Sequence, residues 1–203
     1  MRNFLNRILF CSILVIIFWS ILILKDRNTL NNELIRFHVV ANSDSVEDQT
    51  IKMSVRDVVL NSMKSDLNNI TNFADAKAYL QENLPKIQNL VDQTLNDLGV
   101  DAAAHVSLCK ETFDVRHYDT FSLPAGIYHS LRIVIGEGMG KNWWCVSFPT
   151  LCTPATTSEF VDLAVGSGLS EPLAKTLSGN EEYHLRFYFL NQLGKLECIL
   201  FQN

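Results

Sequence analysis

The sequence predicts an α+β protein in which an N-terminal transmembrane helix precedes a single domain, with an antiparallel or mixed sheet packed against about three helices. The first observation is an uncharged apolar run close to the N-terminus, Ile8–Leu24. The second is the order of the later segments, because runs with helical periodicity precede runs of alternating residues instead of interleaving strictly with them. A hydrophobic content of 47% with 19% charged residues also excludes a disordered chain.

The charge balance argues against a nucleic-acid partner. The 203 residues include 17 Lys and Arg against 22 Asp and Glu, a net charge of −5, without a block of basic residues. Nucleic-acid binding needs a basic patch that faces the phosphates. No internal repeat of roughly 20–50 residues is visible, which excludes a solenoid.

The run Ile8–Leu24 is expected to cross a membrane. Its 17 residues carry no charge and lie between Arg7 and Lys25. As a helix the run is about 25 Å long, near the lower limit for a bilayer core. A helix that is apolar on every face, at a chain end, is rarely the core helix of a soluble domain.

The flanks of this run predict how the chain is placed in the membrane. Trp19–Leu24 offers no small-residue pattern for a signal peptidase, so an uncleaved signal anchor is favoured, with cleavage and release as the alternative. Arg2 and Arg7 favour a cytoplasmic N-terminus. The predicted organisation is a cytoplasmic tail (1–7), a transmembrane signal anchor (8–24), a polar linker (25–32) and an extracytoplasmic domain (33–203).

The domain is expected to begin with a strand and a helix. Leu34–Val40 alternates and is rich in β-branched residues, which predicts a half-buried strand. Ser45 followed by Asp48 has the spacing of a capping box. The apolar period after these residues predicts a helix to about Ser65.

The remaining elements are predicted from periodicity and from helix breakers. A second helical stretch starts near Thr71, and Pro85 is expected to divide it into two helices, the later one ending at Gly99. Strands are expected over 104–110, 115–121, 128–135 and 143–148. After Pro149 the pattern weakens. We expect a strand over 183–190, and 191–201 is either a helix, which is favoured, or the returning strand of a hairpin.

Familiar catalytic and phosphate-binding motifs are absent. Gly136–Lys141 follows a strand as a P-loop would, but only three residues separate its outer glycines and a further strand follows, so we interpret it as a hairpin turn. The G-x-S-x-G, H-E-x-x-H and Asp-Thr/Ser-Gly signatures do not occur. The five histidines are scattered singly, at positions His38, His105, His117, His129 and His184. We expect no catalytic residue, metal, cofactor or small-molecule substrate.

The polar run Asn42–Asp48 has the pattern of a helix cap. An EF-hand loop would need alternating acids, a central glycine and a closing glutamate. We therefore interpret the run as structural, although its polar side chains are dense enough to form a contact surface as well.

Two cysteines are placed to form a bridge. Cys145 ends an aromatic strand and Cys152 follows Pro149, so a turn could bring the two thiols within reach. A zinc site would need a second pair at ligand spacing, and a catalytic cysteine–histidine pair lacks a local signature. A disulfide or buried thiols are favoured over metal binding and catalysis. Cys109 and Cys198 lie in the same domain, and their state is left open.

Two blocks of the chain are distinctive in their residue order. The first is RFHVVANSDSVEDQTIKMSVRDVVL, Arg36–Leu60, and the second is LPAGIYHSLRIVIGEGMGKNWWCVSFPTLC, Leu123–Cys152. Both closely resemble the stage II sporulation protein R family of endospore-forming bacteria. In the second block the glycines, the paired tryptophans, Pro149 and both cysteines stand in the family's order. The resemblance covers most of 34–152, and the segment after Cys152 departs from the pattern.

The resemblance implies a signalling role without catalysis. Members of that family are made in the forespore and exported across its membrane, and they activate a membrane-embedded aspartic protease of the mother cell. That protease then removes the pro-sequence of pro-sigma-E. The chain would thus lie in the forespore membrane with its domain facing the intermembrane space. The alternatives are an exported hydrolase that uses Cys145 or Cys152 with a histidine, and a structural envelope protein.

Partner recognition would use exposed parts of the two blocks. The residues expected to contact the protease are Asn42, Ser43, Asp44, Asp48, Arg56, Trp143 and Trp144. Because side chains alternate along a strand, Trp143 and Trp144 point to opposite faces. At least one of them should pack in the core, and one should be exposed or only partly covered, as interface aromatic residues are.

Overall fold

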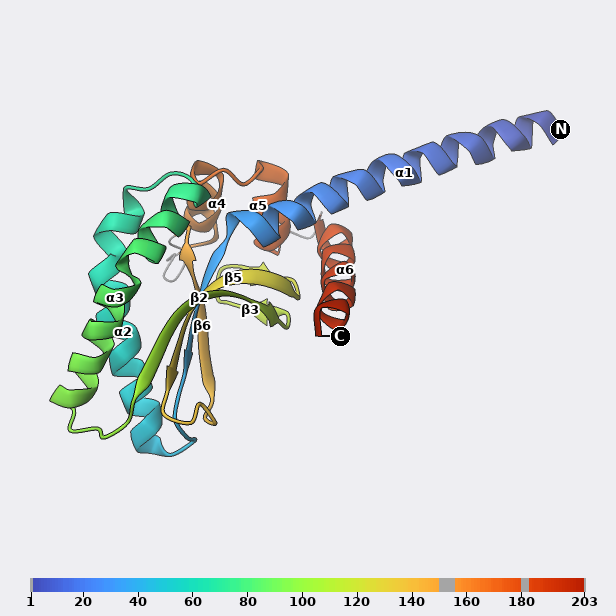
Figure 1. Ribbon diagram of the computed structural model, residues 1–203. Coiled ribbons are helices and arrows are strands. Elements are labelled where there is room, and N and C mark those ends of the chain that lie inside the picture. Colours follow the sequence, from blue (N-terminus) through green and yellow to red (C-terminus); the bar gives the residue numbers. More distant parts are fainter. Residues whose placement is uncertain (1, 150–155, 180–182, 203) are drawn as a thin grey trace.

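The computed structural model describes residues 2–149, 156–179 and 183–202. Its first element, helix α1 (Arg2–Glu33), extends well beyond the rest of the molecule (Figure 1). Residues Asn3–Glu33 are long and apolar enough to span a membrane, which holds for no other helix in the described ranges. Large side chains such as Phe10 and Ile16 are 62% exposed, which is typical of a segment that meets lipid or a targeting receptor instead of a protein core.

The last turns of α1 correct the expected linker. Residues 25–32 continue the helix, with Leu30 fully buried and both Asp26 and Arg27 almost fully buried. Their polar character suggested a loop, but the two charged side chains pair with residues of helix α6 (His184–Gln202). A continuous helix therefore joins the apolar segment to the domain.

Four strands form a mixed sheet in the order β2-β5-β1-β6. They are β1 (Ile35–Val40), β2 (Ala104–Phe113), β5 (Gly126–Ile135) and β6 (Asn142–Phe148). β1 runs parallel to β5 and antiparallel to β6, while β2 runs antiparallel to β5. A separate short hairpin consists of β3 (Arg116–His117) and β4 (Ser122–Leu123). The predicted α+β class and mixed sheet are confirmed.

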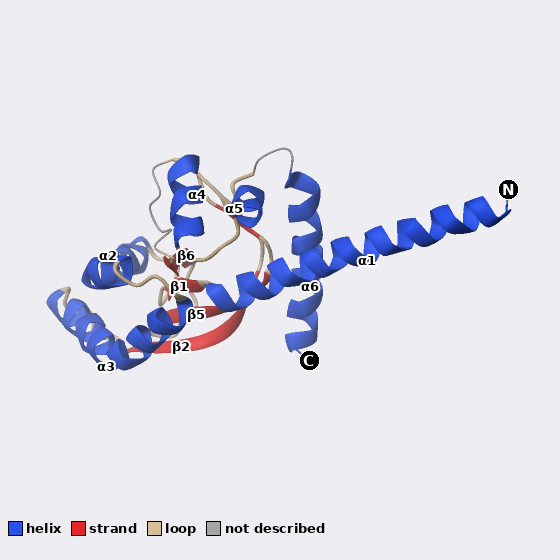
Figure 2. Ribbon diagram, turned by 90° about the horizontal axis from the view of Figure 1, so that it is seen from above, coloured by secondary structure: helices blue, strands red, loops and turns tan. Residues whose placement is uncertain are grey.

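Helices cover both faces of the sheet (Figures 1 and 2). α2 (Val46–Asn68) and α3 (Phe73–Asp97) pack against the face that carries Ile35, Phe37 and Val39. The other face carries Tyr128 and Val146, and it packs against the end of α1 and against α4 (Thr157–Gly166), α5 (Glu171–Leu177) and α6. The described part of the domain thus has more helices than the roughly three expected, because most of the weakly patterned C-terminal region is helical.

Local signals in the sequence fix several helix ends. Ser45 caps α2, and its hydroxyl accepts the backbone N–H of Asp48 at 3.0 Å, as predicted. Asn72 caps α3 in the same way, accepting the N–H of Asp75 at 2.9 Å. Gly99 follows α3 with a φ of 69°, the left-handed conformation that glycine adopts most easily.

Three further expectations about the helices and strands were wrong. Pro85 lies inside α3 and does not divide it, because the buried face of the helix continues beyond it through Ile87. The expected strand over 115–121 is reduced to the two residues of β3. The expected strand over 183–190 is the first half of α6, because Leu190 and Gly194 share the buried side of a helix, whereas the favoured helix over 191–201 is confirmed.

Candidate protein-contact site

The end of the sheet remote from α1 carries most of the residues predicted to contact a partner. α1 ends at Glu33 and β1 begins at Ile35, so β1 leads the chain away from the apolar helix (Figure 1). We call residues 41–48 and 136–141 the distal end. The segment 136–141 crosses the end of β1, because β1 lies between β5 and β6 in the sheet. It is therefore a crossing connection, and the hairpin expected here is wrong.

Backbone hydrogen bonds fix the crossing connection to the end of β1. The N–H of Met139 donates to the Asn42 carbonyl at 3.1 Å, and the N–H of Gly140 donates to the Ala41 carbonyl at 2.9 Å. Glycine is needed at position 140, since a Cβ there would lie 2.1 Å from the carbonyl oxygen of Ser43. The two segments of the distal end therefore form one unit.

Side chains of the loop complete this network. Asn42 accepts the N–H of Glu137 through Oδ1 at 3.0 Å and donates through Nδ2 to Asp48 Oδ2, also at 3.0 Å. The Ser43 hydroxyl donates to the same oxygen of Asp48. Hydrogen bonds from Ser43 and Asn42 hold the pKa of the Asp48 carboxyl below its ordinary value, which favours its ionised form at neutral pH.

Two lysines connect the segment 136–141 to Asp44 and to α2, Lys141 through its backbone and Lys52 through its side chain. Asp44 Oδ1 accepts the backbone N–H of Lys141 at 2.6 Å. The ammonium of Lys52 donates to the Lys141 carbonyl at 2.9 Å and to Gln49 Oε1 at 2.6 Å. Lys52 is only 4% exposed, and burial together with the nearby charge of Arg56 lowers its pKa. The sequence analysis missed Lys52, although its place next to the apolar positions of α2 was an available signal.

The hydrogen bonds give most of the predicted contact residues an intramolecular role. Asn42, Ser43 and Asp48 are half-buried and hold the distal end in one conformation. Asp44 is exposed, and it is Oδ1 of its carboxylate that accepts the backbone N–H of Lys141. That these residues also contact a partner stays a prediction.

Two apolar side chains at the distal end are fully open to solvent. Val46 is 85% exposed and Met139 is 81% exposed, the highest values among the large apolar side chains in the described part of the chain. Both lie on backbone that the network holds in place. Exposed apolar side chains on a rigid support can be buried in a protein contact at a low cost in ordering the loops.

The paired tryptophans lie on opposite faces of the sheet, as alternation predicts. Trp143 packs edge-on against Phe37 with ring centroids 5.9 Å apart, and the Arg56 guanidinium lies 4.9 Å from its ring centroid. Trp144 stacks on His38 at 5.5 Å on the other face. Both tryptophans are half-buried, so neither is a freely exposed anchor.

A buried polar cluster, which the sequence analysis missed, lies on the face of Trp144. Arg36 is fully buried, with its guanidinium 3.9 Å from the Phe113 ring centroid and one nitrogen donating to the Tyr118 hydroxyl at 2.8 Å. His38 Nδ1 lies 3.1 Å from Glu111. Burial alone would raise the pKa of Glu111, but the hydrogen bond with His38 and nearby positive charge outweigh it and lower that pKa. The cluster fastens β2 and the β3–β4 hairpin to the centre of the sheet.

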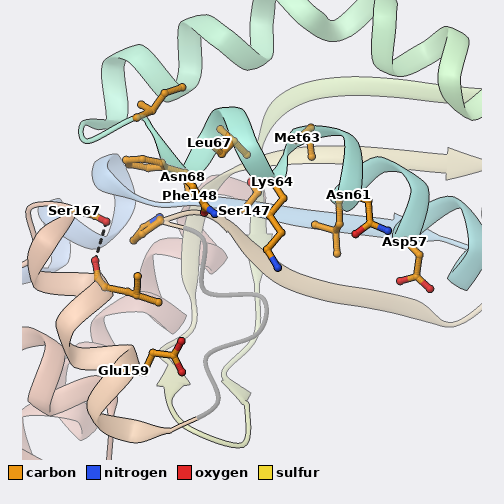
Figure 3. A pocket seen from close by; sticks show the side chains of 14 residues that line it. Asp57, Asn61, Met63, Lys64, Leu67, Asn68, Ser147, Phe148, Glu159 and Ser167 are labelled. Carbon is orange, nitrogen blue, oxygen red and sulfur yellow. Dashed lines mark hydrogen bonds between the residues drawn. The ribbon is translucent and has the colours of Figure 1, made fainter.

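A cleft of about 560 Å³ opens between α2, the end of β6 and α4 (Figure 3). Its floor is apolar, with Met63, Leu67 and Phe148, and Lys64 extends from α2 toward the open space. The cleft contains none of the residues predicted to contact a partner.

Three cysteines of the domain, Cys109, Cys145 and Cys198, do not resemble catalytic nucleophiles. Cys145 is 3% exposed and disulfide-bonded, and its predicted partner Cys152 lies outside the described residues, so that pairing stays a prediction. Burial, followed by the charge of Glu111, raises the pKa of Cys109, and burial also raises that of Cys198. A reactive cysteine needs the opposite shift. Across the described ranges, no three His, Cys, Asp or Glu side chains come together as a metal site would require.

Comparisons with known proteins agree on one family. The sequence profile of the family described as stage II sporulation protein R matches residues 31–158, which include the whole sheet together with α2 and α3. The stage II sporulation protein R of Bacillus subtilis (strain 168) is 33% identical over 147 residues, which cover 72% of this chain and 62% of that relative. The chain therefore matches less than two thirds of the relative's length. No solved structure matches the chain.

Proposed function

We propose that this chain, which belongs to the stage II sporulation protein R family and is a sporulation protein, is an exported activator of a membrane-embedded aspartic protease. The match over residues 31–158 is the observation that carries the proposal. In this proposal the forespore makes the chain and the protease lies in the mother-cell membrane. Activation of the protease starts the processing of pro-sigma-E, and the chain itself performs no catalysis.

Helix α1 supports an uncleaved anchor in the forespore membrane. Cleavage at the end of the apolar run would remove Ile23, which is 3% exposed and packs in the same core as Leu30 and Leu34. The domain would therefore lose part of its core if the segment were removed. Retention of α1 keeps the domain in the intermembrane space, close to the forespore membrane.

The position of the distal end suits a contact across that space. β1 starts where α1 ends and leads away from it, so the distal end is remote from the anchor (Figure 1). Val46 and Met139 would meet the protease, on segments that also carry the exposed acidic residues Asp44, Glu47 and Glu137. The hydrogen-bonded network fixes the loops before binding, which lowers the entropic cost of the contact.

Co-production in a bacterial host that does not sporulate tests the proposal. The host produces the protease and pro-sigma-E, either with the full chain or with α1 alone as the matched control. We expect processed sigma-E only with the full chain. Equal processing in both hosts would overturn the proposal and favour a structural envelope role.

A further inference from the structure

Helix α6 carries a row of exposed apolar side chains that its packing in the domain does not use. Leu185, Leu196 and Leu200 are 64%, 54% and 69% exposed, and Tyr188 and Phe189 are 54% and 39% exposed. Spacings of three, four and seven residues place these side chains on one side of a helix. We call these five residues the α6 stripe.

The opposite side of α6 faces the domain. Leu190 is fully buried, and Gly194 approaches the sheet so closely that a Cβ would lie 1.7 Å from the carbonyl oxygen of Ala125. Asn191 Oδ1 accepts the N–H of Ala125 at 3.0 Å. Helix α6 is therefore apolar on two sides, and the domain covers only one of them.

Contacts with α1 show which way the α6 stripe faces. Arg186 and Glu197, which lie beside the stripe, pair with Asp26 and Arg27 near the domain end of α1. Phe189, within the stripe, contacts Trp19 further toward the N-terminus, with ring centroids 4.8 Å apart.

The two helices cross at a steep angle (Figures 1 and 2). Since Phe189 lies on the side of α6 nearer to Trp19, this part of the stripe faces along α1 toward the exposed apolar segment that starts beyond Trp19.

We propose that the α6 stripe lies in the surface of the membrane that α1 enters. The inference rests on the anchored topology of the proposed function. An amphipathic helix of this kind buries its apolar side at the boundary between headgroups and acyl chains. Trp19 and Tyr188 would lie at this level, where aromatic side chains are enriched.

A lipid surface is the occupant that the structure favours over a second copy of the chain. Through the contact between Phe189 and Trp19, the stripe is continuous with the exposed apolar surface of α1. A bilayer whose surface lies at the level of Trp19 therefore also meets α6. Both helices would then hold the domain in one orientation, with its distal end pointing away from the membrane.

Site-specific quenching in vesicles tests this placement. The full chain carries Cys11→Ala, Cys109→Ala and Cys198→Ala, together with Leu200→Cys labelled with an environment-sensitive dye. Matched chains carry the dye at Ile16→Cys in α1 or at Val46→Cys at the distal end, and a chain without an introduced cysteine gives the background. The vesicles contain phosphatidylcholine and phosphatidylglycerol, with a nitroxide near the top of the acyl chain as lipid quencher and iodide as aqueous quencher.

We expect the lipid quencher to act at least about threefold more strongly on the dye at position 200 than at position 46, and iodide to show the reverse order. If position 16 is quenched by lipid while position 200 behaves like position 46, the anchor stands and the inference is wrong. Protection of position 200 from both quenchers, relieved by diluting the protein in lipid, would assign the stripe to a second copy and also overturn it. If position 16 escapes the lipid quencher, the anchored topology fails, and the inference fails with it.

Discussion

Arg27 of α1 and Glu197 of α6 form an ion pair between the first and the last helix of the chain. Nε and Nη2 of Arg27 donate to Glu197 Oε2 at 2.9 and 2.7 Å, and Nη1 donates to the Ala125 carbonyl at 2.8 Å. Arg27 is only 2% exposed. The helix that enters the membrane in our proposal is thus fastened to the domain by a buried charge with three satisfied hydrogen bonds.

Removal of the buried cation should destabilise the fold. We expect Arg27→Met to lower the free energy of unfolding by about 3 kcal/mol, because it removes the buried hydrogen bonds to the Ala125 carbonyl and to Glu197, whose carboxylate keeps the Asn31 amide as a donor. Denaturation of the full chain in detergent micelles measures this. Lys175→Met, which removes a surface pair with Glu171, serves as the control and should cost less than about 1 kcal/mol. Equal effects of the two variants would contradict the importance of the buried pair.

The close packing of α6 should make one glycine irreplaceable. Glycine to alanine normally stabilises a helix interior by up to about 1 kcal/mol. At Gly194, however, the new Cβ would collide with the Ala125 carbonyl and lie 3.0 Å from the Arg27 guanidinium carbon, so we expect Gly194→Ala to destabilise by about 2 kcal/mol. Gly166→Ala in α4, where a Cβ meets no atom within 4 Å, should be neutral or stabilising. The melting temperatures of both variants measure these effects. A Gly194→Ala protein as stable as the wild type would contradict the close packing of α6 against Ala125.

The sequence predicted those elements whose structure depends on near neighbours. Ser45 and Gly99 acted as helix signals because a cap involves residues only a few positions away. Asp26 and Arg27 gave no such signal, since their partners lie 160 and 170 residues further along the chain. A polar segment was therefore interpreted as a linker when it is a partly buried end of a helix.

The candidate site shows the same limit. The cap at Ser45 was predictable, but the partners of Asn42 and Asp44 lie 95 and 97 residues away, on a connection that was interpreted as a hairpin turn. The insertion of β1 between β5 and β6 is a long-range pairing that periodicity does not encode. Val46 and Met139 went unnoticed because a single apolar residue in a sequence does not reveal whether its side chain is exposed.

Acid should weaken the domain through His129. This residue is 8% exposed, and burial, followed by the charges of Lys77 and Lys110, lowers its pKa from an ordinary 6.5 to about 4. Between these values the unfolded chain binds more protons than the folded one. The stability that the neutral imidazole allows is therefore complete above pH 6.5 and is lost as the pH falls toward 4.

The free energy of unfolding at about pH 7.5 and about pH 4.5 measures this effect, and His129→Gln removes the titrating group. We expect the loss on acidification to be smaller by about 2 kcal/mol in the variant than in the wild type. An identical loss in both proteins would show that His129 does not contribute.

The predicted bridge should couple two cysteines energetically. Cys145 is disulfide-bonded, and Cys152, outside the described residues, is the partner that the sequence predicts. Cys145→Ser and Cys152→Ser should each lower the stability by about 2–3 kcal/mol, and the double variant should add little. The intact mass before and after reduction provides a direct measurement, since a bridge gains two hydrogens. Additive losses, with free thiols at both positions, would contradict the pairing.

The exposed side chains of the distal end should be needed for activation but not for folding. Because Val46 and Met139 lie in solvent, Val46→Asp and Met139→Asp should leave the melting temperature unchanged. Each should reduce the processing of pro-sigma-E by about tenfold if the side chain anchors the contact with the protease. Val165→Asp is the matched control, since Val165 is a 40% exposed apolar residue of α4 and lies outside the distal end.

The most direct test of the central claim, that the chain activates the protease through its distal end, is the fraction of pro-sigma-E cleaved in the co-production host with the double variant Val46→Asp, Met139→Asp. We expect cleavage to fall to the level without the chain, although the variant is folded and present in the membrane in wild-type amounts. With the Val165→Asp chain, the protease should cleave as much pro-sigma-E as with the wild type. Wild-type cleavage of pro-sigma-E in the presence of the folded double variant would contradict the claim.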